Sequence, residues 1–185
     1  KAKDQIIQIN SAALDRSFTK KILVLNSYHQ GHPWTDRITK GIIETFAEDG
    51  TDVDIYIENL DTKRITNRQS WNDILSNKLE SYPPDYLDLM IVSDDNALYS
   101  LYKIGHKYHT TPIVYCSVSE DITRHMDTCS MIIGVEEYLP FKENIELGLT
   151  LFPETEHIAI VTDHSRIGAS HYLSAKHAIK KMDLK

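Results

Sequence analysis

The chain is poor in glycine, and it lacks the glycine-rich loops that hold phosphate groups. It has 7 glycines among 185 residues, which is below the usual share. It contains neither G-x-G-x-x-G after a strand-like run nor G-x-x-x-x-G-K. Such loops let backbone amides approach a phosphate closely. Their absence argues against a nucleotide-dependent enzyme, and we expect no cofactor.

Long apolar runs and an excess of basic residues are also missing. No apolar stretch approaches the length of about 20 residues that a membrane-spanning helix needs. The chain has 20 Lys and Arg against 27 Asp and Glu, a net charge of −7, whereas binding to nucleic-acid phosphates requires clustered cations. We therefore expect no nucleic-acid partner and no membrane span within this sequence.

Cysteine is scarce as well. Cys116 ends a strand-like run and Cys129 lies in a later loop, so both are expected to be free thiols rather than a disulfide. Two H-x-x-H pairs, which begin at His29 and His106, have a spacing found in metal sites. Neither pair has a Cys or Glu partner at a recognised interval. We expect no metal site.

What the chain does contain is a repeated pattern, in which four short apolar runs end abruptly in polar and aromatic residues. These segments lie at 22–34, 89–98, 112–121 and 157–168. In open α/β sheets the carboxyl ends of parallel strands share one edge, and ligands bind outside that edge. The four polar clusters are therefore expected to converge on one site.

Strand-like and helix-like segments alternate along most of the chain. We predict that the first four strands are adjacent and parallel, with helices on both faces of the sheet. The predicted strands are 22–26, 53–57, 87–92, 113–116 and 157–162, and the predicted helices are 34–48, 71–79, a segment beginning at Asp94 or Asp95, 141–151 and 168–182.

The composition changes after Ser119, which suggests a domain boundary near residues 120–130. We expect residues 1–20 to form a short N-terminal helix or linker, residues 21–122 a first α/β lobe, and residues 123–185 the start of a second lobe. That second lobe is short, and a sheet of two strands is marginal alone. Either further chain in the parent protein or a partner is expected to complete it.

The candidate site residues follow the strand-like runs. The loop after the first run combines hydroxyl, imidazole and indole groups, which suit recognition of a small polar or aromatic ligand. We expect Tyr28 and Trp34 to line a cleft rather than the core. Asp94 and Asp95 are explained more easily as helix caps than as catalytic carboxylates, although one of them could bind a ligand amine. The loop 61–64 is expected to pair its charges locally.

Six segments in a fixed order carry a family resemblance: KKILVLNSYHQGHPWTDRITKGI, VDIYIENLDTKR, DLMIVSDDNAL, PIVYCSVSED, IIGVEEY and LGLTLFPETEHIAIVTDHSRIG. They are similar to the ABC-transporter substrate-binding-protein-like family, which serves as extracellular sensor domains of bacterial histidine kinases and related receptors. The resemblance covers almost everything from Lys21 to about Gly168. Two departures are present. Residues 117–119 are Ser-Val-Ser where family members usually carry a glycine and an asparagine, and the chain stops before a complete second lobe.

This resemblance implies a type I periplasmic-binding fold of the α/β class. Two Rossmann-like lobes with parallel sheets would close on a small molecule, with the second lobe incomplete in this chain. It also implies a periplasmic or extracellular location and a membrane-anchored parent protein. The oligomeric state is open, and a homodimer is one option. The expected ligand-binding residues are Ser27, Tyr28, His29, Trp34, Asp94, Asp95, Ser117 and Ser119 from the first lobe, and Glu136, Glu137 and Asp163 from the opposing lobe.

The function expected from these observations is non-enzymatic sensing of a small molecule by a sensor histidine kinase of a two-component system. The start of the sequence, which has neither a methionine nor an apolar leader, is consistent with removal of a signal peptide or anchor. A free periplasmic solute-binding protein of an ABC transporter is the alternative with the same fold. A small hydrolase that uses Cys116 or Ser27 is less favoured, because the Gly-x-Ser-x-Gly elbow is missing.

Overall fold

The structure is a computed structural model that describes residues 5–9, 19–83, 85–104, 110–119 and 131–182. The chain divides into two compact units, Lys1–Glu137 and Tyr138–Lys185, which we call unit 1 and unit 2. None of the described helices is long and apolar enough to span a membrane.

Unit 1 is built on a six-stranded sheet with the order β1-β3-β2-β4-β5-β6. All neighbouring strands are parallel except β1, which runs antiparallel to β3. This arrangement confirms the prediction that the first four predicted strands, now β2 to β5, are adjacent and parallel. The strands are β1 (Gln5–Ile9), β2 (Lys20–Asn26), β3 (Val53–Asn59), β4 (Leu89–Ser93), β5 (Ile113–Ser119) and β6 (Ile132–Glu137).

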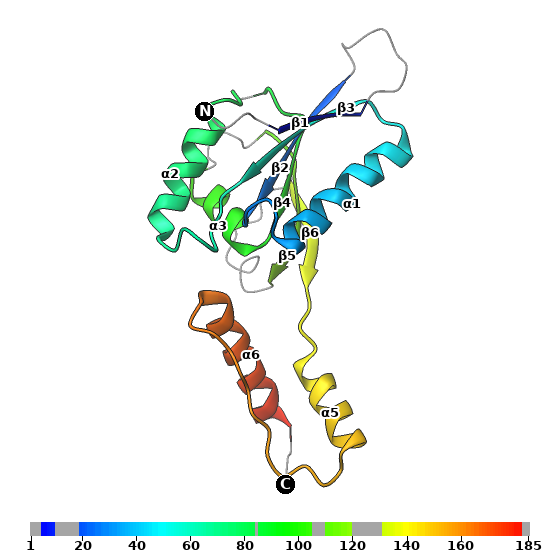
Figure 1. Cartoon of the computed structure of the whole chain (residues 1–185), viewed down its shortest axis with the longest axis vertical. Helices are drawn as coiled ribbons and strands as arrows, with labels where there is room; N and C mark the ends of the chain where they lie inside the picture. Colours follow the sequence, from blue (N-terminus) through cyan, green and yellow to red (C-terminus); the bar gives the residue numbers. More distant parts are fainter. Residues whose placement is uncertain (1–4, 10–18, 84, 105–109, 120–130, 183–185) are drawn as a thin grey trace. The chain divides into compact units, whose positions relative to one another are not determined.

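Helices cover both faces of this sheet, as predicted (Figure 1). On one face, α1 (Pro33–Asp49) packs Ile42, Ile43 and Phe46 against a buried cluster that contains Ile22 and Val24 of β2. On the other face, the cluster that contains Leu23 and Leu25 of the same strand includes apolar side chains of α2 (Arg68–Leu79) and α3 (Asp95–Ile104). Successive side chains of a strand point to opposite faces. The continuous apolar run of β2 is therefore buried on both.

Local signals set the limits of two helices. α1 begins with Pro33 in its first turn and ends at Gly50, which has a φ of 73° and donates its N–H to the Phe46 carbonyl. Proline fits the first turn because no backbone donor is needed there, and glycine adopts the left-handed end without strain. α2 begins after Asn67, whose side chain accepts a hydrogen bond from the Gln69 N–H.

Two predicted boundaries in unit 1 need correction. Part of segment 1–20 forms strand β1 rather than a helix, and its Ile7 and Ile9 pack against the α1 face of the sheet. The expected start of a second lobe at residue 123 is also too early, because β6 pairs with β5 and closes the first sheet. Gly134 allows this pairing, since a Cβ atom there would lie 2.2 Å from the Tyr115 carbonyl oxygen.

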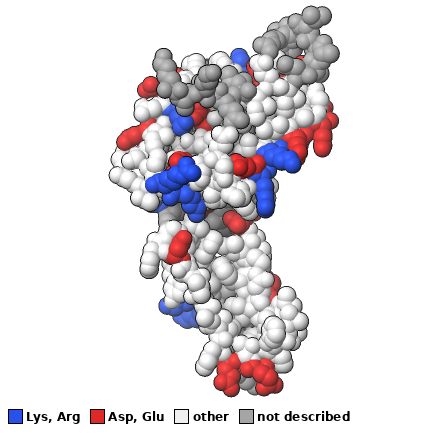
Figure 2. Space-filling view, viewed as in Figure 1, with Lys and Arg blue, Asp and Glu red and all other residues white. Residues whose placement is uncertain are grey.

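Unit 2 contains two helices, α5 (Phe141–Leu151) and α6 (Arg166–Lys181), close to the predicted ranges. The predicted strand 157–162 is not formed. A strand needs a neighbour for its backbone donors and acceptors, and unit 2 has none among its described residues. Val161 is 95 % exposed. Much of the surface over α5 and α6 is uncharged in the view of Figure 2.

Candidate functional site

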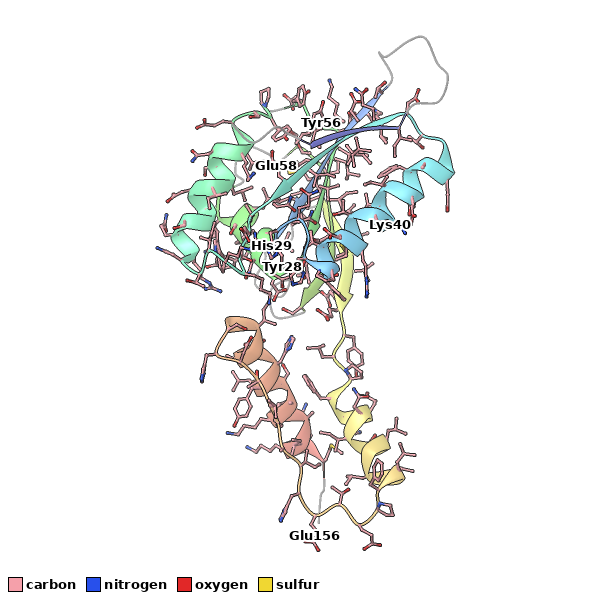
Figure 3. The ribbon with its side chains drawn as sticks, in the orientation of Figure 1. Tyr28, His29, Lys40, Tyr56, Glu58 and Glu156 are labelled. Carbon is pink, nitrogen blue, oxygen red and sulfur yellow. The ribbon has the colours of Figure 1, made fainter. Side chains whose placement is uncertain are left out.

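The polar residues that follow β2, β4 and β5 lie together at one edge of the sheet in unit 1. Asn26 is the register partner of Ser93, and Ser93 is the register partner of Cys116. The three strands therefore end side by side, and the loops that follow them meet there. Figure 3 shows Tyr28 and His29 at this end of the sheet. The predicted convergence is confirmed for the three clusters of unit 1.

A buried hydrogen-bond network holds the three strand ends in place. Ser27 Oγ donates to the Ser93 carbonyl oxygen (2.9 Å) and accepts from the Ala97 N–H (2.8 Å). Asn26 accepts from the Ser93 hydroxyl (2.8 Å) and donates to Asn59 (3.1 Å). Ser27 thus caps α3 from another strand. Its hydroxyl is fully buried, and it both donates and accepts a hydrogen bond with backbone groups. Ser27 therefore lacks the features of an activated nucleophile.

Asp94 occupies an unusual position at the centre of this edge. Its φ is 67°, and its N–H donates to the Cys116 carbonyl oxygen (3.0 Å). The carboxylate is 6 % exposed. Its Oδ1 accepts from Trp34 Nε1 (3.1 Å), whereas Oδ2 is buried without a hydrogen-bond partner among the described residues. Ser27 accepts the hydrogen bond at the start of α3 that a capping Asp94 would accept. The Asp94 side chain therefore does not have the capping role predicted for it.

The electrostatic environment keeps Asp94 close to half-protonated at neutral pH. Burial raises its pKa to about 7, the hydrogen bond from Trp34 opposes that rise, and the negative charges of Asp95 and Glu137 add to it. Burial disfavours the charged form of a carboxyl group, and nearby like charges act in the same direction. A carboxyl group poised in this way at a sheet edge is typical of functional sites.

Asp95 has a different role from its neighbour. It accepts hydrogen bonds from the Ser119 N–H (2.8 Å) and from the Ser119 hydroxyl. It therefore fixes the end of β5. Just before this contact, Ser117 has a φ of 57° at an irregularity in the β5–β6 pairing. A bulge of this kind redirects side chains at the end of a strand.

The two aromatic residues predicted to line a cleft differ in exposure. Trp34 is 43 % exposed, but Tyr28 is only 5 % exposed, which departs from the expectation for Tyr28. The Tyr28 ring is covered by His32, at 4.9 Å between ring centroids, and by Lys63, whose Nζ lies 4.8 Å from the ring centroid. Burial, followed by the charge of Asp94, raises the pKa of the Tyr28 phenol. Tyr28 is therefore a buried residue of this edge, and Trp34 is the aromatic residue of the site that remains exposed.

The loop after β3 also belongs to this edge, and the sequence interpretation did not assign it there. Thr62 is buried and accepts from Asn96 Nδ2 (3.0 Å), and Lys63 lies over Tyr28. Asp61 pairs locally with Arg64 (3.5 Å), as predicted, and also with His29 Nδ1 (3.2 Å). β3 is parallel to β2, so the rule that strand ends share an edge would have identified this loop.

Two of the three acidic residues expected from an opposing lobe lie in unit 1 instead. Glu136 and Glu137 are exposed at the end of β6, so they belong to the same sheet as Asp94. Asp163 lies in unit 2, where its Oδ1 accepts from the N–H and the hydroxyl of Ser165 at the start of α6. The structure therefore assigns Asp163 a local role beside the α6 cap.

Cys116 has the properties of a protonated thiol. Burial and, secondarily, the charge of Asp94 raise its pKa, and it is a free cysteine. Nucleophilic cysteines require a lowered pKa. Cys129, His106 and His109 lie outside the described residues. Within the described part of the chain, no three His, Cys, Asp or Glu side chains are grouped as metal ligands would be.

A cavity of about 330 Å³ opens beside this edge, on the α1 face of the sheet. Ile43 of α1 and Ile57 of β3 contribute apolar walls, and Thr35, Thr39 and Asn59 contribute polar groups. Thr35 and Trp34 both lie in the first turn of α1, and of these two residues Thr35 lines the cavity. The cavity is large enough for a small molecule, and its lining includes neither Trp34 nor Asp94.

Several solved structures are similar to this chain, while no protein-family model and no curated protein matches it. A conserved domain protein from Vibrio cholerae superposes with a TM-score of 0.68 at 16% identity, covering 90% of this chain and 55% of that one. The ABC domain from Streptococcus pneumoniae in complex with L-Trp has a TM-score of 0.63 at 22% identity, covering 86% and 53%. An open, ligand-free substrate-binding protein with adhesive properties from Clostridium difficile has a TM-score of 0.57 at 18% identity, covering 88% and 55%.

These likenesses show the fold. The chain has the α/β fold of substrate-binding proteins, as the resemblance in the sequence implied, and it spans about half the length of the similar structures. In open α/β sheets, ligands bind outside the carboxyl edges of the strands. The edge that carries Trp34 and Asp94 is therefore the candidate binding surface contributed by unit 1.

Proposed function

We propose that this chain is the small-molecule-binding part of an extracytoplasmic sensor domain, which belongs to a membrane-anchored bacterial histidine kinase of a two-component system. The observation that carries the proposal is the pair formed by Trp34 and Asp94. An exposed indole donates to a buried carboxyl group at the edge where open α/β sheets bind ligands. The substrate-binding-protein fold supports the same function.

Signalling would follow from a shift between open and closed arrangements of two lobes. A ligand changes such an equilibrium only by its differential affinity for the two states. Contacts from unit 1 alone would bind a ligand without discriminating between those states. The sensor role therefore requires that a second lobe also touches the ligand in the closed state.

A free solute-binding protein of an ABC transporter is the second candidate. The likeness to an ABC domain in complex with L-Trp and to a substrate-binding protein favours it. The genomic neighbourhood separates the two candidates: a kinase module in the same polypeptide supports the sensor, and a separate permease gene supports transport.

A hydrolase is not proposed. Ser27 Oγ is occupied by two hydrogen bonds, and burial raises the pKa of Cys116. Treatment of the native chain with an electrophilic ester analogue, followed by intact mass measurement, is expected to leave both residues unmodified. A stoichiometric adduct at either residue would make the hydrolase the better reading.

The proposed function is tested by a thermal-shift screen of the full chain against a library of small metabolites. A ligand at about a hundred times its Kd is expected to stabilise the fold by about 2.7 kcal/mol. The Trp34→Ala variant is expected to weaken binding of any hit by about 1–3 kcal/mol, because a large ring contributes much of the contact area.

The control is Tyr102→Ala, which removes a half-buried ring from α3. Tyr102 lies seven residues beyond Asp95 in α3, or about 10 Å along the helix. Binding of the hit should survive in this variant. Equal losses in both variants, or the absence of any hit with folded protein, would contradict the proposed function.

A further inference from the structure

We propose that Asp94 is the anchor for a cationic group, so that the ligand class of this site is an amine whose carbon framework lies against Trp34. This inference rests on the proposed function, because it names the chemistry recognised at the same edge. It depends on the contacts of the Asp94 carboxyl group and on the charges that surround it.

The first argument is the unused oxygen of Asp94. Oδ2 is buried and accepts no hydrogen bond among the described residues, while Oδ1 accepts from Trp34, and the Tyr28 hydroxyl also acts on this carboxyl group by hydrogen bonding. An unpaired buried carboxylate costs free energy. The backbone carries a second cost, because a φ of 67° is uncommon for a residue with a side chain. A ligand that donates a hydrogen bond to Oδ2 would relieve the first cost.

The second argument is the sign of the surrounding charge. The groups that act on Asp94 from the neighbouring elements include two further carboxylates, Asp95 at the start of α3 and Glu137 at the end of β6. The Tyr28 phenol and the Cys116 thiol, which also respond to Asp94, are held in their neutral forms by raised pKa values. An anionic ligand would meet three acidic groups here, whereas a cation is attracted by all three.

The third argument is the position of the indole. Trp34 Nε1 donates to Asp94, so the edge of the ring is fixed at the carboxyl group while 43 % of the residue stays exposed. A ligand bound at Asp94 has the exposed part of the indole beside it, so its carbon framework can pack against that ring. Lys63 does not fill this position, because its Nζ lies over Tyr28 instead.

These features couple amine binding to a proton. The pKa of Asp94 is raised to about 7, so an empty site carries a proton on Asp94 below that pH. An ammonium group binds the ionised carboxylate and must displace this proton. The affinity is therefore expected to rise about tenfold per pH unit below 7 and to level off above it.

The test uses three probes of similar size and different charge: phenethylamine, phenethyl alcohol and 3-phenylpropionate. Binding to the full chain is measured by isothermal titration calorimetry about one pH unit below and above 7. We expect the amine to bind at least about tenfold more tightly than the other two probes. We also expect it to bind more tightly at the higher pH, with release of a proton at the lower pH.

Two variants with a matched control assign the effect to Asp94. Asp94→Asn keeps the shape and tolerates the left-handed backbone, and Asp94→Gly accepts the same φ with no side chain if the first variant folds poorly. Both are expected to lose the preference for the amine and the pH dependence. Asp73→Asn removes a carboxylate from the exposed surface of α2 and should retain both.

The outcomes separate this inference from the proposed function. Failure of phenethylamine to bind at millimolar concentration, equal binding of the alcohol or the propionate, or amine binding that persists in Asp94→Asn would overturn the cationic subsite. If a neutral or anionic metabolite binds and Trp34→Ala abolishes its binding, the proposed function stands and this inference falls. If the whole metabolite screen is negative, both fall.

Discussion

Unit 1 and unit 2 are built from similar sequence patterns but bury very different amounts of apolar surface. Unit 1 contains two clusters of buried side chains, one on each face of its sheet. In unit 2, Ala175 is the one apolar residue that is buried among the described positions, and several large apolar residues are exposed: Leu147, Leu151, Phe152, Val161 and Leu173.

This difference shows that an amphipathic pattern becomes stable structure only when it has a surface to pack against. The helices of unit 1 lie on a sheet whose strands supply that surface. The helices of unit 2 pack without a sheet, and the apolar run 157–162 is not paired as a strand. Most helical stability in proteins comes from tertiary packing rather than propensity. We therefore expect unit 1 to dominate the measured unfolding transition.

The largest effect should come from matched leucine truncations in the two units. Leu75 of α2 is completely buried, and Leu147 of α5 is 56 % exposed. Leu75→Ala should lower the free energy of unfolding by about 2–5 kcal/mol, because it leaves a cavity. Leu147→Ala should change it by less than about 0.5 kcal/mol. Urea titrations followed by circular dichroism measure both, and similar losses in the two variants would show that unit 2 has a core of its own.

The second effect concerns the buried carboxyl group of unit 1 and depends on pH. The pKa of Asp94 is raised from 3.8 to about 7 by burial, so between these pH values the folded protein holds a proton that the unfolded chain has lost. Stability therefore falls as the pH rises through this window, by at most about 4 kcal/mol. Above pH 7 the free-energy cost of burying the ionised Asp94 carboxylate is fully present, and below about pH 4 it is absent.

Asp94→Asn should remove that cost. The variant is expected to be more stable than the native chain about one unit above pH 7, and equally stable near pH 4. Thermal unfolding across this range measures the difference. A variant that is destabilised at every pH would mean that the charged carboxylate is already satisfied in the empty protein. The same charge would then offer little attraction to an amine.

A smaller effect is expected from equivalent helix caps in the two units. The side chain of Asn67 accepts from the Gln69 N–H at the start of α2, and that of Ser165 accepts from the Gly168 N–H at the start of α6. Asn67→Ala should lower the free energy of global unfolding by about 1 kcal/mol. Ser165→Ala should instead increase amide exchange within α6 and leave the unit 1 transition unchanged. A shift of the global transition by both would show that the two units unfold together.

The sequence predicted the centre of unit 1 well because β2 and β4 are buried on both faces. The apolar runs of β2 and β4 and the helix start and stop signals between the strands are local sequence features, and they agree with the sheet that forms. The predicted start of the second lobe at residue 123 was wrong because the run MIIGV carries no local signal for the sheet that it joins. Its pairing with β5 decides that. Strand 157–162 failed for the opposite reason, since its pattern is strand-like but its partner is missing from the described residues.

The candidate site was predicted in outline and not in its details. The rule that parallel strands share an edge located Trp34, Asp94 and Ser119. It could not tell that Ser27 would cap α3, because that contact joins residues 70 positions apart. This capping is what leaves Asp94 available. The burial of Tyr28 was missed for a similar reason, since the side chains that cover it come partly from the loop after β3.

The smallest effect compares two lysines that lie over tyrosine rings, one in each unit. Lys63 Nζ is 4.8 Å from the centroid of the buried Tyr28 ring, and Lys176 Nζ is 5.9 Å from the centroid of the exposed Tyr172 ring. Cation–π contacts are worth about 0.5–1 kcal/mol at exposed sites and more when they are desolvated. Lys63→Ala should therefore lower the free energy of unfolding by up to about 1 kcal/mol, and Lys176→Ala should have no measurable effect. Urea titrations of both variants measure these changes. If Lys63→Ala abolished binding of a screening hit while the fold stayed intact, the loop after β3 would be part of the binding surface, and the role assigned to Lys63 as a cover for Tyr28 would be incomplete.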